Sequence, residues 1–434
     1  MNKQILQLAI PNIISNITVP LLGMVDLAII GSLNDYNLIA AIGIGIGVFN
    51  LLYWNFGFLR MSTSGFTAQA YGAKKIDDAV VILVRGLILS ISIAFLFLVM
   101  QVPLIKLSLF ILNTSSENYA LVMEYYKIRI WAAPATLSLF VTSGWFIGMQ
   151  NSKTPMFISI ITNVINLILS YVFALIFQMG IAGIALGTLF AQYLGLVLSV
   201  VIIFKRYKYY LVKIPYKAAF QLKKMRRFFA VNSDIFLRSI ALCIVFTFFT
   251  SASSLLGNEI LSLNTIFMQL FIFFSYFMDG FANAAEALVG RFIGANNLLK
   301  LQEIVMKINL WGLGSAIFCS LIYFVGLNFI LDIFFEDSNI IRLAETHKLL
   351  IVSVPLISFL AFIYDGIMIG ATRSKEMRNT MFVSCITFIV LYYSFIDSLG
   401  NTALWIAFLS FLSLRGFLLL LSYHLRIPHK KVVS

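Results

Sequence analysis

The feature that most constrains this chain is a series of apolar runs that are long enough to cross a lipid bilayer. The hydrocarbon core of a bilayer is about 30 Å thick and needs roughly 20 apolar residues in a helix. Such runs recur along the whole chain of 434 residues. Charged residues make up only 11% of the sequence, whereas soluble domains carry about 25%. Lipid rather than water must therefore cover most of the folded surface.

The breaks between the apolar runs are charged or turn-forming clusters, and they divide the chain into twelve predicted membrane helices. The fold class is therefore an all-α polytopic membrane protein. The first residues show no basic region followed by a short apolar stretch and a cleavage site, so we expect the first helix to stay in the mature protein. The predicted helices span residues 5–33, 38–71, 79–103, 118–148, 155–177, 181–204, 228–256, 260–290, 304–331, 349–371, 379–396 and 401–423.

Basic residues concentrate in alternate connections between these helices. The connection at 205–227 is rich in Lys and Arg and contains no acid, whereas the opposite loops hold only Lys106, Arg342 and Lys348. By the positive-inside rule, this predicts that both termini and the 205–227 loop are cytoplasmic. Topology thus accounts for the net charge of +13 without a nucleic-acid partner.

An internal repeat joins the two halves of the chain. The sequence GWFIGMQNSK at 144–153 matches GIMIGATRSK at 366–375, an offset of 222 residues (366 − 144 = 222). After a shift of three residues, TPMFISIIT at 154–162 matches NTMFVSCIT at 379–387. These matches indicate that a unit of six helices has been duplicated, and an even number gives parallel repeats about an axis along the membrane normal.

The duplication predicts three parts of the chain. Residues 1–204 form an N-terminal lobe of six helices, residues 205–227 a basic cytoplasmic linker, and residues 228–434 a second lobe of six helices. Two such lobes leave a cleft between them.

Acidic residues within the predicted helices need a partner, a hydrated cavity or a function, because a charge there costs about 2.5–3.5 kcal/mol on insertion scales. Three of them have a basic neighbour nearby in the sequence, and these we interpret as structural pairs: Glu124 with Lys127, Asp234 with Arg238, and Glu286 with Arg291. Asp279 and Asp365 have none, and both a structural and a functional role stay open for them.

Asp26 is the unpaired acid of the first half, since no basic residue occurs between Lys3 and Arg60. Pro11 lies fifteen residues earlier, about 60° away around an ideal helix. A proline removes one backbone hydrogen bond, so Pro11 is either a static kink or a hinge that moves the face carrying Asp26.

Two later helices of the first half carry polar side chains on one face. Asn163, Asn166 and Ser170 are spaced i, i+3 and i+7, and Thr188 and Gln192 are spaced i and i+4. Such groups often join helices to one another. Together with Asp26 they could instead line a hydrated substrate cavity.

Motifs for catalysis and cofactors are missing from the sequence. It contains no P-loop, and Gly43, Gly45 and Gly47 lie in an apolar helix without a preceding strand. We therefore expect neither an enzyme nor a metal or organic cofactor. The cysteines show no CxxC spacing and the histidines lie in loops or beyond the last helix; these residues are Cys243, Cys319, Cys385, His347, His424 and His429.

Several long stretches closely resemble the DinF branch of the MATE family of efflux transporters. They are found at residues 58–73, 125–135, 232–257, 263–295 and 364–379. The resemblance covers essentially the whole chain. It implies two six-helix lobes around a V-shaped cleft and a multidrug antiporter driven by H⁺ or Na⁺.

The resemblance also assigns roles to single residues. It implies that Pro11 and Asp26 frame a cation site in the first lobe, and that Asn166 and Thr188 are the polar residues of helices five and six. This chain has Ser170 where well-studied members have a second aspartate, which leaves Asp26 as the one obvious proton carrier of the lobe.

The family's alternative cation site, in the second lobe, has possible equivalents here in Asp234 and Asp365. The expected partners are amphipathic small molecules and membrane lipids, and the expected form is a monomer in a bacterial plasma membrane.

Three functions remain open from the sequence. The first is H⁺-coupled or Na⁺-coupled export of amphipathic, often cationic compounds. The second is a flippase for a lipid-linked or amphiphilic substrate. The third is a receptor or scaffold that transports nothing, against which the repeat and the isolated Asp26 argue.

Overall fold

A computed structural model describes the backbone of residues 1–31, 36–111, 118–211, 221–334 and 338–427. The side chains of these residues are described except at 19–31, 36, 37, 211, 222, 223, 328, 332–334 and 338–341. The second half of the first helix, including Asp26, therefore has a described backbone but no described side chains.

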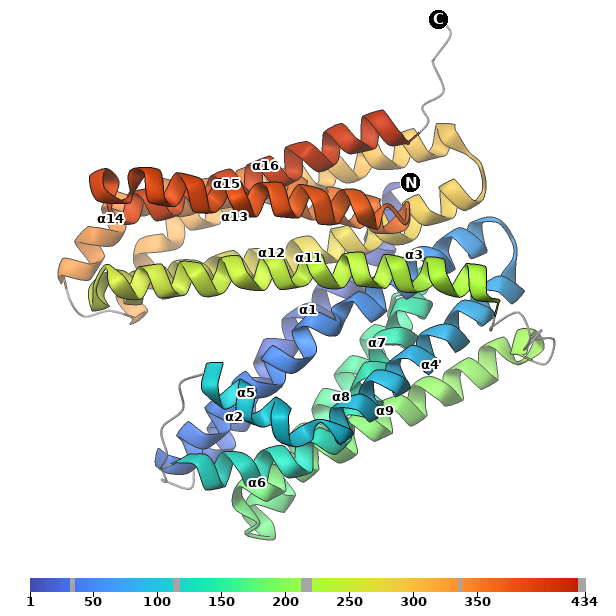
Figure 1. The fold of residues 1–434 in the computed structure, drawn as a ribbon, viewed down its shortest axis with the longest axis horizontal. Coiled ribbons are helices and arrows are strands. Elements are labelled where there is room, and N and C mark those ends of the chain that lie inside the picture. The colour runs from blue at the N-terminus through green and yellow to red at the C-terminus, as the bar shows by residue number, and fades with distance from the viewer. Residues whose placement is uncertain (32–35, 112–117, 212–220, 335–337, 428–434) are drawn as a thin grey trace, which may run out of the picture. The chain divides into compact units, whose positions relative to one another are not determined.

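The described chain is helical throughout (Figure 1). The first half contains α1 (Asn2–Gly31), α2 (Tyr36–Trp54), α3 (Phe58–Gly72), α4 (Ile76–Val99), α5 (Gln101–Ile111), α6 (Tyr119–Arg129), α7 (Ala133–Gly148), α8 (Lys153–Tyr171) and α9 (Gly180–Leu211). The second half contains α11 (Leu222–Leu255), α12 (Asn258–Gly294), α13 (Leu298–Phe334), α14 (Ser338–Gly370), α15 (Ser374–Leu399) and α16 (Asn401–Arg426).

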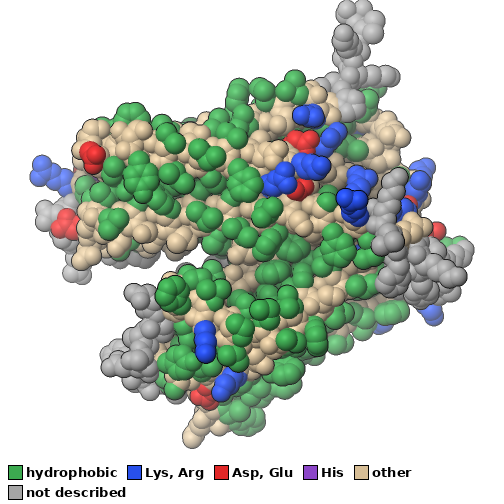
Figure 2. Space-filling model, in the orientation of Figure 1, with side chains coloured by type: hydrophobic (Ala, Val, Ile, Leu, Met, Phe, Trp, Pro, Cys, Tyr) green, Lys and Arg blue, Asp and Glu red, His purple; other side chains and the backbone are tan. Residues whose placement is uncertain are grey.

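Within the described residues, 11 helical segments are long and apolar enough to cross a membrane. They correspond to the predicted helices other than the first, and the first is itself helical from Asn2 to Gly31. Figure 2 shows apolar side chains along the sides of the helices, with most charged side chains toward the helix ends. The all-α polytopic fold predicted from the sequence is confirmed.

The backbone repeats with an offset of 222 residues. Helix α12 covers 258–294, which corresponds position by position to α2, a short 3-10 turn and α3 at 36–72. The interhelical turns repeat in the same register, because residues with positive φ recur at equivalent places. These residues are Lys74 and Asn296, Gln150 and Thr372, and Gln178 and Gly400.

This register corrects one detail of the sequence comparison. The positive-φ residues before and after α8 and before and after α15 keep the same offset. The three-residue shift inferred between 154–162 and 379–387 is therefore wrong, since a real insertion would have displaced the turn that follows. The local match reflects the similar composition of residues 154–162 and 379–387.

The two repeats also share a helix contact made by small residues. In each repeat, two glycines one turn apart let a helix pack directly on the backbone of its neighbour. A Cβ at Gly148 would lie 2.7 Å from the Ser64 carbonyl oxygen, and one at Gly370 would lie 2.5 Å from that of Glu286. Small residues permit this close approach of membrane helices. The equivalent contacts one turn earlier are Gly144 on Arg60 and Gly366 on Ala282.

The chain divides into two compact units, Ile14–Phe228 and Met1–Ile13 together with Phe229–Ser434. This division differs from the predicted lobes at the beginning of the chain. The first three turns of α1 group with the C-terminal unit, where a Cβ at Gly280 would lie 3.0 Å from the Ala9 carbonyl oxygen. Pro11 lies just before the residue at which α1 passes from one unit to the other.

The predicted linker 205–227 is helical at both of its ends. Helix α9 continues to Leu211, and α11 begins at Leu222. The first two turns of α11 belong to the N-terminal unit, where Phe228 contacts Phe66 of α3 with 5.6 Å between ring centroids. Residues 212–220 lie outside the described part of the chain.

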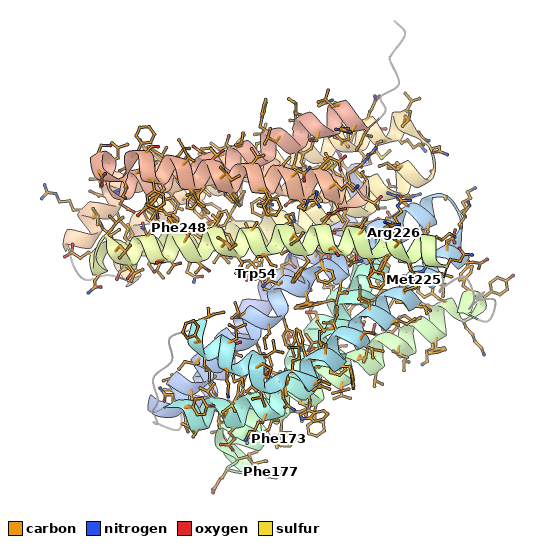
Figure 3. The ribbon with its side chains drawn as sticks, viewed as in Figure 1. Trp54, Phe173, Phe177, Met225, Arg226 and Phe248 are labelled. Atoms are coloured by element: carbon orange, nitrogen blue, oxygen red, sulfur yellow. The ribbon has the colours of Figure 1, made fainter. Side chains whose placement is uncertain are left out.

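Aromatic side chains pack against one another within each unit, and Figure 3 labels Phe248 of the C-terminal unit and Phe173 and Phe177 of the N-terminal unit. In the C-terminal unit, Phe248 of α11 makes edge-to-face contacts with Phe388 and Tyr392 of α15. In the N-terminal unit, Phe173 stacks on Phe177 with 6.0 Å between ring centroids, at the π-turn Val172–Ile176, and Phe177 is 62% exposed, so this pair lies at the surface. Each such pair contributes about 0.5–1.5 kcal/mol beyond its buried area.

Candidate functional site

Helix α1 carries the two residues for which we predicted the coupling role. The helix is continuous through Pro11, which is buried, and the Asn12 amide next to it donates to the Leu8 carbonyl at 2.7 Å. The Asp26 side chain lies outside the described residues. The coupling role of both residues therefore stays a prediction.

The polar residues predicted on α8 and α9 are brought together. The Asn166 amide donates to the Thr188 hydroxyl at 2.9 Å, and that hydroxyl donates to the Ile184 carbonyl at 3.2 Å. Asn166 and Thr188 are both buried, and Ser170 is fully buried against Gly187. Part of the polar stripe therefore joins α8 to α9.

Not every polar atom of this stripe has a partner. Within the described residues, the Asn166 carbonyl oxygen and the Ser170 hydroxyl are buried without a hydrogen bond, as is the Asn163 amide nitrogen. Gln192 is partly exposed. A buried polar atom normally has a partner, so these groups retain hydrogen-bonding capacity that the contact between α8 and α9 does not use.

Helix α3 adds buried hydroxyls that the sequence analysis missed. Thr63, Ser64 and Thr67 are 0% exposed, and within the described residues their hydroxyl oxygens have no hydrogen bond. The motif STSGFT at 62–67 was the available signal. Small hydroxyl residues are common wherever membrane helices pack closely, so the motif alone could not have separated the two explanations.

In the C-terminal unit, Asp365 binds two arginines from different helices. Its Oδ2 accepts from Arg238 of α11 at 2.7 Å and from Arg415 of α16. All three residues are buried. The sequence placed no basic residue beside Asp365, because both partners are distant along the chain.

Asp234 forms a second buried ion pair. It accepts from Arg378 at 2.6 Å and from the Ser374 hydroxyl at 2.8 Å, which joins α11 to α15. The predicted pair of Asp234 with Arg238 is therefore wrong. The two side chains are one turn apart on the same helix, but each reaches across to a partner on a neighbouring helix.

These contacts change the interpretation of the second-lobe acids. Asp234 and Asp365 were candidates for an alternative cation site, and guanidinium groups of the protein itself now neutralise both. The equivalent positions of the first repeat are uncharged: Asn16, Ser143 and Tyr193 stand where the second repeat has Arg238, Asp365 and Arg415. These three buried charges therefore have no charged counterparts in the first repeat.

The remaining acids differ in environment. Glu286 is 1% exposed on α12, and the Arg291 guanidinium lies 5.6 Å from the Phe292 ring. Their pairing stays a prediction. Among the described side chains, Glu124 and Lys127 are both exposed and form no ion pair with each other, so that prediction is wrong. Exposed charges can be solvated and need no partner.

The described residues contain no group of three or more His, Cys, Asp or Glu side chains that could hold a metal ion. Two parallel repeats of membrane helices, with polar side chains buried between helices, are the organisation of one class of polytopic membrane transporters. The comparisons with known proteins specify this class further.

The chain belongs to the MATE family, because residues 11–172 and 235–394 match the family model described as MatE. It is 34% identical to DNA damage-inducible protein F of Escherichia coli over 96% of this chain and 90% of that protein. It is 26% identical to the probable multidrug resistance protein NorM of Thermotoga maritima, over 90% of this chain and 83% of the relative.

Its fold matches a crystal structure of a MATE protein in the bent conformation with a TM-score of 0.89. That match has 18% identity and covers 98% of this chain and 95% of the other. The predicted family and its DinF branch are confirmed. The protein is a multi-pass efflux transporter rather than an enzyme.

Proposed function

We propose that this transporter exports amphipathic organic compounds, often cationic, in exchange for protons carried by Asp26. The observation that supports this assignment most is the state of the other candidate acids. Asp234 and Asp365 are bound to arginines at 2.6 and 2.7 Å, whereas the sequence from Lys3 to Arg60 offers Asp26 no basic neighbour.

The absence of a second acid on α8 favours a proton over a sodium ion. Ser170 stands where a second carboxylate would complete a site with two acids. Sodium is a hard cation that prefers several oxygen ligands, whereas a proton needs a single titratable group. Serine can accept and donate hydrogen bonds but cannot exchange a proton at biological pH.

The names of two relatives support the type of cargo. The Thermotoga maritima relative is described as a probable multidrug resistance protein, and the Staphylococcus aureus protein MepA, which is 20% identical, as a multidrug export protein. Multidrug cargo is typically apolar with a few polar groups. The buried amide and hydroxyl groups of Asn166, Ser170 and Thr188 offer matching hydrogen bonds.

Coupling follows if the two protonation states of Asp26 favour different conformations of α1. With Asp26 deprotonated, a straight α1 leaves a pocket in the first lobe that accepts cargo. Protonation from outside lets α1 bend near Pro11, which closes the pocket and expels the cargo. The proton and the cargo then compete for binding to the first lobe.

Transport in inside-out vesicles under separate proton and sodium gradients tests the proposal. We expect a proton gradient to drive uptake of a cationic dye, and a sodium gradient at constant pH to have no effect. Asp26→Asn cannot titrate, so it should abolish gradient-driven uptake while folded yield stays near wild type. Pro11→Ala should keep proton binding but slow turnover.

Asp397→Asn is the matched control, because Asp397 is an exposed acid on α15 and the chemical change is the same. It should transport normally. Gradient-driven uptake by Asp26→Asn at the wild-type rate would exclude Asp26 as the carrier, and uptake driven by sodium alone would exclude proton coupling.

A further inference from the structure

The C-terminal unit contains a groove on its own surface, between α13, α14 and α16. Its volume is about 570 Å³, within the range of about 300–1,000 Å³ that is typical of small-molecule sites. The three helices lie together in this unit (Figure 1). Neither the coupling residues nor the polar stripe of the first lobe contributes to the groove.

One wall of the groove is an apolar stripe of α13. Met306 and Leu310 are 59% and 60% exposed, and Leu313 is 39% exposed. Beside Leu313, α13 packs closely on α14 at Gly312, where a Cβ would lie 2.9 Å from the Ile363 side chain. A flexible hydrocarbon chain fits such a wall.

The floor of the groove is mostly apolar, but it includes the polar side chains of Asn309 and Tyr364. The Asn309 amide donates to the Val305 carbonyl at 2.8 Å and to the Tyr364 hydroxyl at 3.4 Å. The Tyr364 and Tyr423 rings meet edge to face at 5.9 Å. Hydrogen-bonding groups at membrane depth are expensive to leave facing hydrocarbon, so an occupant with polar atoms suits this floor better than an acyl chain alone.

The groove opens toward the end of the unit where α13 begins and α16 ends. Gln302 lies near the start of α13, and within the described residues its side-chain amide makes no hydrogen bond. His424 lies in the last turn of α16. Arg373 donates to the Arg426 carbonyl at 3.2 Å, which places the ends of α14 and α16 beside each other.

The charge at this opening is positive. The nearby acids are already paired, Glu303 with Lys307 at 2.7 Å and Glu376 with Arg373 at 3.5 Å. Among the described side chains, no acid forms an ion pair with Arg426. An anionic group at the opening is therefore attracted, and a cationic one is repelled.

We propose that this groove binds one anionic phospholipid. Its acyl chain lies along Met306, Leu310 and Leu313, its ester groups meet Asn309 and Tyr364, and its phosphate lies near Gln302 and Arg426. The charge at the opening selects a lipid over the cationic cargo. Under the predicted topology, the lipid comes from the cytoplasmic leaflet.

Native mass spectrometry and thermal unfolding of the delipidated protein test this site. Dioleoyl phosphatidylglycerol should be retained as one molecule per chain and should raise Tm more than dioleoyl phosphatidylcholine, which has the same acyl chains. Leu313→Trp fills the groove and should abolish both effects. Leu321→Trp, on the same helix but outside the groove, should retain them.

Arg426→Gln tests the contribution of the positive charge separately from the fit of the lipid to the groove. It should weaken binding of phosphatidylglycerol about fivefold, which corresponds to about 1 kcal/mol for one basic residue at an anionic surface, and leave phosphatidylcholine unchanged. Equal effects of the two lipids on the wild type would overturn the anionic preference. Unchanged lipid binding in Leu313→Trp would show that the lipid binds elsewhere, and displacement of the lipid by a cationic cargo dye would assign the groove to cargo.

Discussion

The carboxylate of Asp365 is the single charge whose loss the fold should tolerate least. It holds Arg238 and Arg415, which are both 4% exposed. Asp365→Asn removes the carboxylate that both buried guanidinium groups bind, and breaking a buried pair typically costs about 3–5 kcal/mol. We expect a loss of stability of this size in thermal or denaturant unfolding of the purified protein.

The same substitution at Asp397 is the control, since an exposed site should change stability by no more than about 0.5 kcal/mol. If Asp365→Asn unfolded like the wild type, the two arginines would not depend on this carboxylate. A stable Asp365→Asn variant that does not transport would instead assign a coupling role to the second lobe.

Single residues also show which contacts could be predicted from the sequence and which could not. Which acids needed partners was predictable, because a charge in an apolar run is visible in the sequence. Which basic residues would pair with these acids was not predictable, since Arg238 and Asp365 are separated by 127 positions. The nearest basic residue along the helix was the wrong guide for Asp234, whose partner Arg378 is on α15.

At the scale of helices, most boundaries could be predicted because apolar runs end at charged or turn-forming clusters. The unit to which the beginning of the chain belongs could not be predicted from these clusters. Residues 1–13 group with the C-terminal unit, as the close approach of Gly280 to Ala9 and Ile13 illustrates. No sequence pattern marks a helix that begins in one unit and continues in the other.

This contact between α1 and α12 gives a prediction about Gly280. Any side chain there would overlap Ile13 and approach the Ala9 carbonyl oxygen at 3.0 Å. Overpacking of this kind costs about 1–3 kcal/mol, so Gly280→Leu should lower the unfolding temperature of the purified protein. The first turns of α1 should also lose protection in hydrogen exchange.

Gly314→Leu is the matched control, because a Cβ at Gly314 meets nothing within 4 Å and the new side chain points into open space. Its stability should stay within about 0.5 kcal/mol of the wild type. Equal tolerance of both substitutions would mean that α1 is not anchored at Gly280.

At the scale of the whole molecule, the duplicated backbone carries two different sets of buried polar groups. Among the described residues, the N-terminal unit buries hydroxyl and amide groups without hydrogen-bond partners, such as those of Thr63 and Ser170, whereas the C-terminal unit buries ion pairs. Ion pairs fix helices to one another, and unpartnered hydroxyls leave them free to exchange partners. This difference supports the N-terminal unit as the one that changes during transport.

The last prediction concerns the orientation of the molecule in the membrane. The basic connections predict cytoplasmic termini, and exposed residues at opposite helix ends allow a direct test. In a variant with Cys243, Cys319 and Cys385 replaced by alanine, Lys106→Cys and Arg342→Cys should react with an impermeant maleimide added to intact cells. Lys75 and Lys375 are also exposed in the structure, so burial cannot explain a failure of Lys75→Cys or Lys375→Cys to react. These two variants should react only after the membrane is opened.

Because the two positions of each pair come from different repeats, one experiment reports on the orientation of both repeats. Labelling of Lys75→Cys but not Lys375→Cys in intact cells would contradict parallel repeats, and labelling of both would reverse the orientation and place the groove opening at the outer leaflet.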